Sequence, residues 1–320
     1  MIKVKISSSE NVEKLLEQSP GGKGIWNNCE FFINNDNDNC DYWVILYKIT
    51  RKEHAVCPPE NTIFVTGEPP SLKHYSRHFL NQFSTVLTAQ EKMQYSNVIH
   101  THQILPWLLN KNYDEVAFFS PLEKTKTMSI ICSNKRFSKG HEERYQFALD
   151  LKGYFGNRLD FYGRGIRDFK DKWDTIAPYK YSIAIENYSS KYWVTEKLWE
   201  NYLSLTYPFY YGCTNIGDYY PSESLSIIDI HNFEGTIDVI EGVLGDSDHY
   251  LRHLPYLIEA KKRYLKDYSI FSQLDQVINT MGTTNPSPKK DITIIPSIVG
   301  DSKIVCLSMS ILRYFMKKIL

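Results

Sequence analysis

Short apolar runs that are typical of β-strands alternate with helical or loop segments along this chain, and the alternation begins twice. The first series fills about the first 120 residues, and the second starts after the polar stretch 121–127. Strands are expected at 2–6, 30–33, 42–47, 62–65, 85–87, 128–132, 159–162, 181–185, 209–211 and 225–230, and helices or loops at 10–18, 71–83, 141–154, 171–179 and 194–205. Such alternation predicts an α/β chain with two doubly wound domains. Because open α/β sheets bind ligands beyond the carboxyl ends of their strands, we expect a cleft between the domains.

The same patterns divide the 320 residues into three parts. We expect a first domain at 1–122, a second at 123–282, and a linker followed by a C-terminal helix at 283–320. The final stretch, 303–320, has apolar residues at helical spacing on one face, with lysines and an arginine on the others. This pattern fits either a last helix packed on the protein or an amphipathic helix on an anionic membrane surface.

Charge and hydropathy exclude several classes of protein. Lys+Arg and Asp+Glu are equal at 37 each, so the chain lacks the basic excess that holds a protein on a nucleic-acid backbone. No apolar run reaches the ~20 residues of a membrane-spanning helix, and the start MIKVKISSSE resembles a strand, not a signal peptide. The six cysteines are scattered without zinc-ligand spacing, which favours free core thiols. We therefore expect a cytoplasmic protein.

The most informative segment is 179–221, where chemistry-bearing residues follow a buried strand. The strand ends in Glu186-Asn187, and Thr195-Glu196-Lys197 then opens a helix. In a doubly wound domain this helix N-terminus and the adjacent lysine can receive a diphosphate, while a glutamate can accept hydrogen bonds from ribose hydroxyls. On spacing alone, the alternative is that Glu196 caps the helix and Lys197 is a solvated side chain.

The segment also has a family signature, carried by Tyr179-Lys180-Tyr181, Glu186-Asn187, Val194-Thr195-Glu196-Lys197, Asn201, Pro208 and Gly212. It resembles the donor-binding signature of the α-1,3/1,4-fucosyltransferases, glycosyltransferase family 10. The similarity extends to SNKRFSKGHEERYQFALDL at 133–151, LDFYGRG at 159–165 and IFVTGEPPS at 63–71. It covers about residues 60–275 and is strongest in the second half.

The resemblance implies a GT-B fold with an acceptor-side N-terminal domain and a nucleotide-side C-terminal domain. It implies GDP-fucose as donor, inversion at the anomeric carbon and no required metal or other cofactor. Glu68 matches the proposed general base, and Arg144 and Lys197 match the residues that hold the diphosphate. The further donor contacts implied are Glu186, Asn187, Tyr192, Trp193 and Glu196. Gly163 follows the strand expected at 159–162, which is the place for a nucleotide-facing turn, so it either contacts the donor or only forms a tight turn. Trp193 stands where bacterial members place a tyrosine beside the nucleotide, so this role is open between Trp193 and Tyr192.

Two other motifs carry less weight. Asp36-Asn37-Asp38 resembles a DxD metal pair but lies in an Asn/Asp-rich turn, and Gly21-Gly22-Lys23-Gly24 lacks the flanking elements of a phosphate loop. The histidine spacing offers no hydrolase or metal site, so we expect no metal.

We therefore expect a bacterial-type α-1,3-fucosyltransferase that modifies the 3-OH of an N-acetylglucosamine or glucose unit. Its expected partners are the GDP-sugar donor and an oligosaccharide or lipid-linked acceptor, in lipopolysaccharide biosynthesis or protein glycosylation. Residues 303–320 would give a peripheral contact at the inner face of the membrane, and nucleic acid is not expected. The alternatives are a family member that takes another GDP-deoxysugar, and a catalytically silent protein that binds a glycan or nucleotide.

Overall fold

The computed structural model describes residues 1–35, 38–120, 123–282 and 287–297. The described residues form two compact units: the first contains those of 1–16, 27–101 and 278–297, and the second contains those of 17–26 and 102–277. The boundaries therefore differ from the expected 122/123 and 282/283. The reason is packing, since Trp107, Leu109 and Val116 belong to the core of the second unit. The side-chain amide of Gln18 brings 17–26 to the same unit by donating to the Trp107 carbonyl over 2.7 Å.

The first unit is built on a parallel sheet in the order β3-β1-β4-β6-β7-β8. The strands are β1 (Ile2–Ser7), β3 (Cys29–Ile33), β4 (Tyr42–Leu46), β6 (Thr62–Val65), β7 (Thr85–Thr88) and β8 (Val98–His100). All residues of β4, β6 and β7 are buried, as expected for strands covered on both faces. The connections are mostly loops and short 3₁₀ turns, with α1 limited to Arg77–Leu80. Helical coverage of this sheet is thus thinner than a doubly wound pattern predicts.

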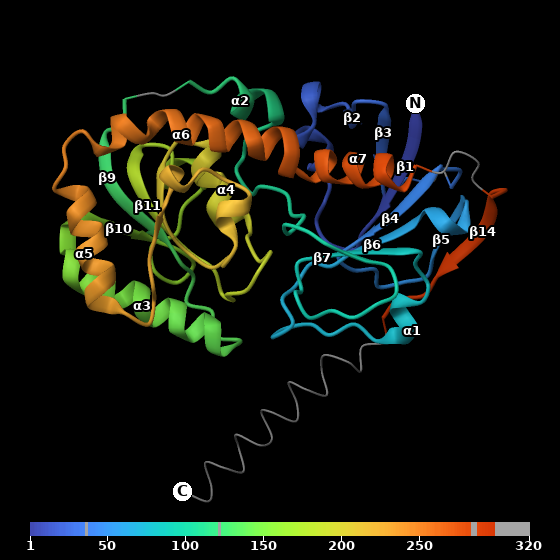
Figure 1. Cartoon of the computed structure of the whole chain (residues 1–320), viewed down its shortest axis with the longest axis horizontal. Coiled ribbons are helices and arrows are strands. Elements are labelled where there is room, and N and C mark those ends of the chain that lie inside the picture. Colours follow the sequence, from blue (N-terminus) through green and yellow to red (C-terminus); the bar gives the residue numbers. More distant parts are fainter. Residues whose placement is uncertain (36–37, 121–122, 283–286, 298–320) are drawn as a thin grey trace, which may run out of the picture. The chain divides into compact units, whose positions relative to one another are not determined.

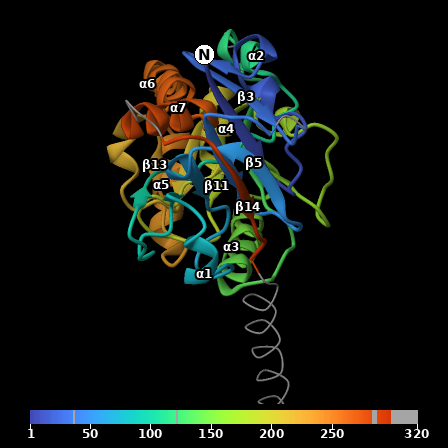
Figure 2. The ribbon, with the colours of Figure 1, turned by 90° about the vertical axis from the view of Figure 1, so that its right-hand side faces the viewer.

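A two-stranded antiparallel ribbon completes the first unit. Strand β14 (Lys290–Ile294) pairs with β5 (Glu53–Cys57), and the two lie side by side in Figures 1 and 2. Ile294 is fully buried against the cluster that contains Ala55 and Cys57. The expectation that 283–320 holds only a linker and a terminal helix was therefore wrong for 290–294, because alternate side chains of this segment enter the core. The amphipathic stretch 303–320 lies outside the described residues.

The second unit has a parallel sheet in the order β10-β9-β11-β12-β13, of which β9, β10 and β11 are labelled in Figure 1. Its strands are β9 (Lys126–Ile131), β10 (Leu159–Tyr162), β11 (Tyr179–Ile185), β12 (Tyr207–Tyr211) and β13 (Ser226–Ile227). Its helices are α2 (Tyr113–Ala117), α3 (Lys139–Phe155), α4 (Glu196–Leu203), α5 (Phe233–Leu244) and α6 (His249–Arg263), and α7 (Ile270–Met281) crosses the boundary between the units. The chain first passes from β9 to β10 on one side of it, and then crosses to β11 on the other side of β9. This change of side creates a topological switch point between β9 and β11.

The helix expected near 171–179 is not formed. Residues 173–175 make a single 3₁₀ turn, and the Asp171 carboxylate accepts from the Trp173 N–H over 3.0 Å. Pro178 disfavours helical geometry at Ala177 and lacks an N–H to continue a helix. The segment therefore remains a connection that can approach the ligand edge of the sheet.

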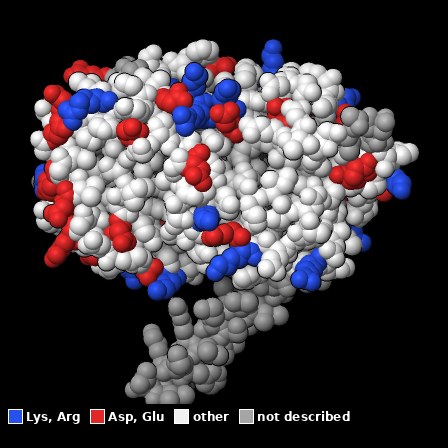
Figure 3. All heavy atoms as spheres, in the orientation of Figure 1, with Lys and Arg blue, Asp and Glu red and all other residues white. Residues whose placement is uncertain are grey.

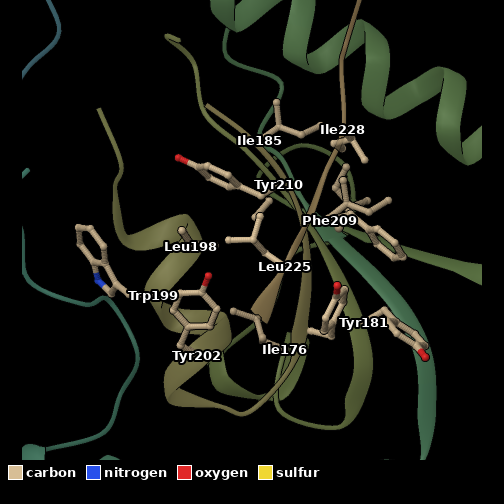
Figure 4. Close-up of a cluster of buried hydrophobic side chains, with 14 of the residues drawn as sticks. Ile176, Tyr181, Ile185, Leu198, Trp199, Tyr202, Phe209, Tyr210, Leu225 and Ile228 are labelled. Atoms are coloured by element: carbon tan, nitrogen blue, oxygen red, sulfur yellow. The ribbon is translucent and has the colours of Figure 1, made fainter. Parts of the chain in front are cut away.

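Helix α4 is fixed by the core of the second unit. Its side chains Leu198, Trp199 and Tyr202 are fully buried and meet strand residues such as Ile185 and Phe209 in one cluster (Figure 4). Burial of side chains of this size contributes roughly 1.5–3 kcal/mol each. The packing thus sets where the N-terminus of α4 lies.

The surface agrees with the balanced composition. On the face shown in Figure 3, Lys and Arg side chains of the described residues are interspersed with Asp and Glu. None of the described helices has the length and apolarity required to cross a membrane. The five described cysteines are buried, and none of them forms a disulfide with another described residue.

Candidate functional site

A cavity of about 680 Å³ opens in the second unit where three parallel strands end. Ser133 follows β9, Gly163 follows β10, and Ile185 ends β11, and all three line the cavity. These carboxyl ends flank the switch point at β9, where doubly wound domains bind their ligands. Most of the remaining wall comes from α4, from residues 163–172 and from residues 108–110, and Arg144 of α3 also lines it.

The cavity wall carries an excess of positive charge. Six basic and four acidic side chains line it: Lys135, Arg144, Arg164, Lys170, Lys172 and Lys197, and Asp168, Asp171, Glu196 and Glu200. Charged donors of this kind form strong hydrogen bonds to phosphate oxygens. The acids pair with some of these cations and hold them in place.

Lys197 is held at the first turn of α4 by two carboxylates. Its ammonium lies 3.4 Å from Glu186 Oε2 and 3.2 Å from Glu196 Oε1, and it donates to Thr195 Oγ1 over 2.9 Å. Burial lowers the pKa of Lys197, but the charges of Glu186 and Glu196 outweigh burial and raise it. The side chain is therefore a fixed cation at the N-terminal end of a helix dipole.

The Glu186 carboxylate accepts hydrogen bonds at the N-terminal end of α4. Its Oε1 accepts from the Thr195 N–H over 2.7 Å, and the Thr195 hydroxyl lies 2.8 and 2.7 Å from the two carboxylate oxygens. Burial raises the pKa of the Glu186 carboxyl, which the Lys197 charge partly opposes. Glu186 is 1% exposed and is not among the cavity-lining residues. Its role in this structure is to position the first residues of α4.

Glu196 faces the cavity as an ionised carboxylate. Burial favours its neutral form, but the cations of Lys197 and Lys172 lower its pKa to about 2. A carboxylate that stays charged is a strong acceptor for the hydroxyls of a sugar.

Arg144 comes from the second turn of α3, whose N-cap is Ser138. The residue is 7% exposed, and its Nε has no hydrogen-bond partner among the described residues. A buried, unpaired charged donor is costly unless a ligand supplies an acceptor. The Nε of Arg144 is thus a charged donor at the cavity wall for which a ligand could supply the acceptor.

Gly163 is required by the close approach of two strand ends. Its φ is +147°, and a Cβ at this position would lie 2.0 Å from the Cys132 carbonyl oxygen. A glycine therefore brings the end of β10 against the end of β9 at the cavity wall.

The structure divides the expected donor residues into two groups. Arg144, Gly163, Glu196 and Lys197 line the cavity, whereas Glu186, Asn187, Tyr192 and Trp193 are not among its lining residues.

The residues outside the cavity wall have other neighbours. The Asn187 amide lies 3.4 Å from His141 Nε2, and the Tyr192 N–H donates to Asn215 Oδ1 over 2.8 Å. Trp193 is only 2% exposed and its ring meets Tyr188 edge-on, so protein covers the face that a nucleotide base would need. Donor contacts from Asn187, Tyr192 and Trp193 stay predictions.

An ion pair that the sequence did not lead us to expect lies at the cavity wall. Lys172 from the connection after β10 pairs with Glu200 of α4, and Glu200 Oε1 also accepts from the Leu108 N–H over 2.6 Å. Glu200 stands four residues after Glu196 and so shares its helix face, which is the one signal in the sequence that could have identified it. No local pattern predicts Lys172 as its partner.

Glu68 belongs to the first unit. It lies three residues after β6 and is exposed at the carboxyl edge of that sheet, as its place after the strand predicted. Its carbonyl oxygen accepts from the Gln90 side chain over 2.7 Å. Of the DxD-like pair, Asp38 forms a 2.6 Å ion pair with Lys5 and Asp36 lies outside the described residues. The described residues contain no group of three or more His, Cys, Asp or Glu placed to hold a metal.

Comparisons with known proteins agree with this architecture. Residues 121–277 match the family model described as glycosyltransferase family 10 (fucosyltransferase), C-terminal. A stretch of 83 residues is 31% identical to the alpha-(1,3)-fucosyltransferase FucT of Helicobacter pylori, covering 26% of this chain and 17% of that relative.

Solved structures extend the likeness over most of the chain. Crystal structures of alpha1,3-fucosyltransferase align with a TM-score of 0.53 for the GDP-fucose complex (16% identity, 90% of this chain, 92% of that one). The TM-score is 0.55 for another crystal structure of alpha1,3-fucosyltransferase, with 16% identity over 88% of this chain and 89% of that one. An alpha-glucosyltransferase in complex with UDP and DNA aligns with a TM-score of 0.52, with 9% identity over 87% of this chain and 100% of that one. At these identities the likeness shows the fold, which is GT-B.

Proposed function

We propose that this chain, in which residues 121–277 form the C-terminal domain of glycosyltransferase family 10, transfers L-fucose from GDP-fucose to a glycan hydroxyl. The observation that carries the proposal is the cavity at the ends of β9, β10 and β11, where Arg144, Lys197 and Glu196 meet. Two cations suit a diphosphate, and an ionised carboxylate suits ribose hydroxyls. The name of the Helicobacter pylori relative supports α-1,3 linkage.

The proposed reaction inverts the anomeric carbon in one displacement. The acceptor hydroxyl oxygen forms a bond to C1 of fucose while the bond from C1 to the diphosphate oxygen breaks, and GDP leaves with the electron pair. Glu68 takes the proton of the hydroxyl as general base. Arg144 and Lys197 stabilise the negative charge that develops on the diphosphate, which is the task that fixed cations perform most effectively. The proposal assigns no step to a metal.

The acceptor proposed is the 3-OH of an N-acetylglucosamine or glucose unit in a bacterial surface glycan, such as lipopolysaccharide. The proposed place of action is the cytoplasm, at the inner face of the membrane. Equal numbers of acidic and basic residues, at 37 each, support a carbohydrate partner over nucleic acid.

Glu68→Gln tests the proposal. We expect GDP release from GDP-fucose, with N-acetyllactosamine or water as acceptor, to slow by roughly 100-fold or more, because a carboxamide cannot accept the proton. The Kd for GDP should remain within about twofold, since the donor cavity lies wholly in the other unit. Glu91→Gln, at an exposed position of the same unit, is the matched control.

Each alternative has its own outcome in this assay. Turnover with another GDP-deoxysugar but not with GDP-fucose would identify a different donor. GDP binding without turnover of any donor would favour the silent binding protein.

A further inference from the structure

The loop that carries Glu68 is tied by a buried side chain from the neighbouring strand. β6 and β7 are adjacent and parallel, with Val65 opposite Leu87, so the segments that follow them emerge at the same edge of the sheet. Gln90, two residues after β7, donates from Nε2 to the Glu68 carbonyl over 2.7 Å and to the Lys73 carbonyl over 3.0 Å. One amide thus fastens both ends of the segment 68–73.

Gln90 is itself rigidly held. It is 5% exposed, and its backbone N–H donates to Thr88 Oγ1 over 3.0 Å. Thr88 Oγ1 lies 2.8 Å from Thr66 Oγ1, which ties the end of β7 to the end of β6. The Gln90 amide therefore fixes the segment that holds Glu68 relative to the carboxyl ends of β6 and β7.

Tyr75 supports the other side of this loop. Its hydroxyl accepts from the Gly67 N–H over 3.4 Å, and its ring packs edge-on against Phe64 with centroids 5.0 Å apart. Between these supports the chain makes a turn, in which the N–H groups of Leu72 and Lys73 donate to the Pro69 carbonyl over 2.9 and 3.0 Å. Glu68 thus stands on a loop whose carbonyls at Glu68, Pro69 and Lys73 accept hydrogen bonds from within the unit, while its own side chain is exposed.

We infer that Gln90, assisted by Tyr75, is a positioning residue for the Glu68 carboxylate in the transfer reaction. The inference rests on the proposed function, in which Glu68 takes the proton of the acceptor hydroxyl. A general base acts only within hydrogen-bond reach of that proton, and displacement by about 1 Å costs on the order of 100-fold in rate. Gln90 has the geometry to prevent such displacement without touching the substrate.

Gln90→Met tests the inference because methionine has a similar length but cannot donate to either carbonyl. We expect kcat for GDP release from GDP-fucose, with N-acetyllactosamine or water as acceptor, to fall roughly 10- to 100-fold. The Kd for GDP should stay within about twofold. Gln82→Met is the matched control: its Nε2 also donates to two carbonyls, those of Phe79 and Ile295, over 3.3 and 3.0 Å, but it does not contact the Glu68 loop.

A double-mutant cycle separates positioning from general destabilisation. If Gln90 acts through Glu68, Gln90→Met in the Glu68→Gln background should reduce the remaining turnover by less than about threefold. The inference would be overturned if the rate losses of Gln90→Met and Glu68→Gln multiplied in full in the double variant. It would also be overturned if Gln90→Met had the same kcat as Gln82→Met. In either case a strong loss in Glu68→Gln alone leaves the proposed function standing.

Two further readouts complete the test. If Glu68→Gln keeps the turnover of the unmodified protein, the proposed function and this inference fall together. If Gln90→Met does not fold, Tyr75→Phe provides the same cycle, because it keeps the ring packing and removes only the hydroxyl that accepts from Gly67. For Tyr75→Phe we expect a loss of roughly three- to tenfold that disappears in the Glu68→Gln background.

Discussion

Lys197 shows how a single side chain acquires its function from its neighbours. A lysine in the first turn of a helix is ordinarily unfavourable, because the helix dipole repels it. Glu186 and Glu196, at 3.4 and 3.2 Å, offset this repulsion and raise the pKa of Lys197. The cation can therefore remain beside Arg144 at the cavity wall.

Lys197→Gln should weaken GDP binding by roughly 10- to 100-fold, because it removes one charged contact to the diphosphate. Isothermal titration of GDP measures this loss. Lys191→Gln, at an exposed position of the preceding loop, should bind GDP as the unmodified protein does. Unchanged affinity in Lys197→Gln would contradict the assignment of this cavity to the donor.

At the scale of elements, the end of α4 depends on a buried lysine. Lys124 donates to the carbonyls of Ala177 and Ser204 over 2.6 and 2.7 Å and to Thr206 Oγ1 over 3.1 Å. Ser204 is the C-cap of α4, so Lys124 joins the helix end to the connections that precede β11 and β12. Burial lowers the pKa of Lys124 to about 7, although its three acceptors favour the charged form.

This pKa predicts a pH-dependent stability. Between about pH 7 and pH 10.5, the ordinary pKa of lysine, the unfolded chain keeps a proton on Lys124 that the folded chain has lost. The free energy of unfolding therefore gains a contribution that rises with pH in this window, by up to about 1.4 kcal/mol per pH unit. Urea unfolding of the unmodified protein and of Lys124→Met, at pH 6.5, 7.5, 8.5 and 9.5, should show a difference that grows above pH 7.

The exposed Lys262 provides the control. The difference between the unmodified protein and Lys262→Met should be independent of pH. A difference for Lys124→Met that is equally flat would show that Lys124 keeps its ordinary pKa in the folded protein.

At the scale of the whole molecule, the chain returns to its first unit after completing the second. It contributes 17–26 to the second unit, re-enters that unit after residue 101, leaves it within α7, and adds β14 to β5. The stability of the first unit therefore depends on residues almost 240 positions away from β5, of which Ile294 is fully buried.

A chain that ends at Gly282 should lose this support while keeping the donor cavity. Removing a buried isoleucine and exposing the pairing edge of β5 should lower the thermal midpoint of the first unit by roughly 10 °C or more. Calorimetry with and without GDP separates the units, because GDP should still stabilise the second one. A chain that ends at Ser297 keeps β14 and is the control; identical melting of the two truncated chains would contradict this prediction.

The same control chain tests the proposed membrane contact. Residues 303–320 combine apolar residues at helical spacing with lysines and an arginine. The full chain should therefore float with vesicles rich in phosphatidylglycerol, and the chain that ends at Ser297 should not. Binding to neutral phosphatidylcholine vesicles should be weaker, since the electrostatic attraction is missing. Equal flotation of the two chains would remove these residues from the proposal.

The sequence alone determined the features that depend on neighbouring residues. Strand β10 and helix α4 follow from local apolar patterns, and Glu186, Thr195 and Lys197 lie within twelve residues, so their spacing already places them at one strand-to-helix turn.

Only the tertiary structure decided which side chains face the cavity. It paired Lys172 with Glu200, covered the ring of Trp193, and placed β14 beside β5, and none of these follows from spacing. It also replaced the expected helix at 171–179 with a connection that lines the cavity. The physical reason is that periodicity records whether a side chain is buried, whereas the partner that buries it comes from elements far along the chain, and only folding brings them together.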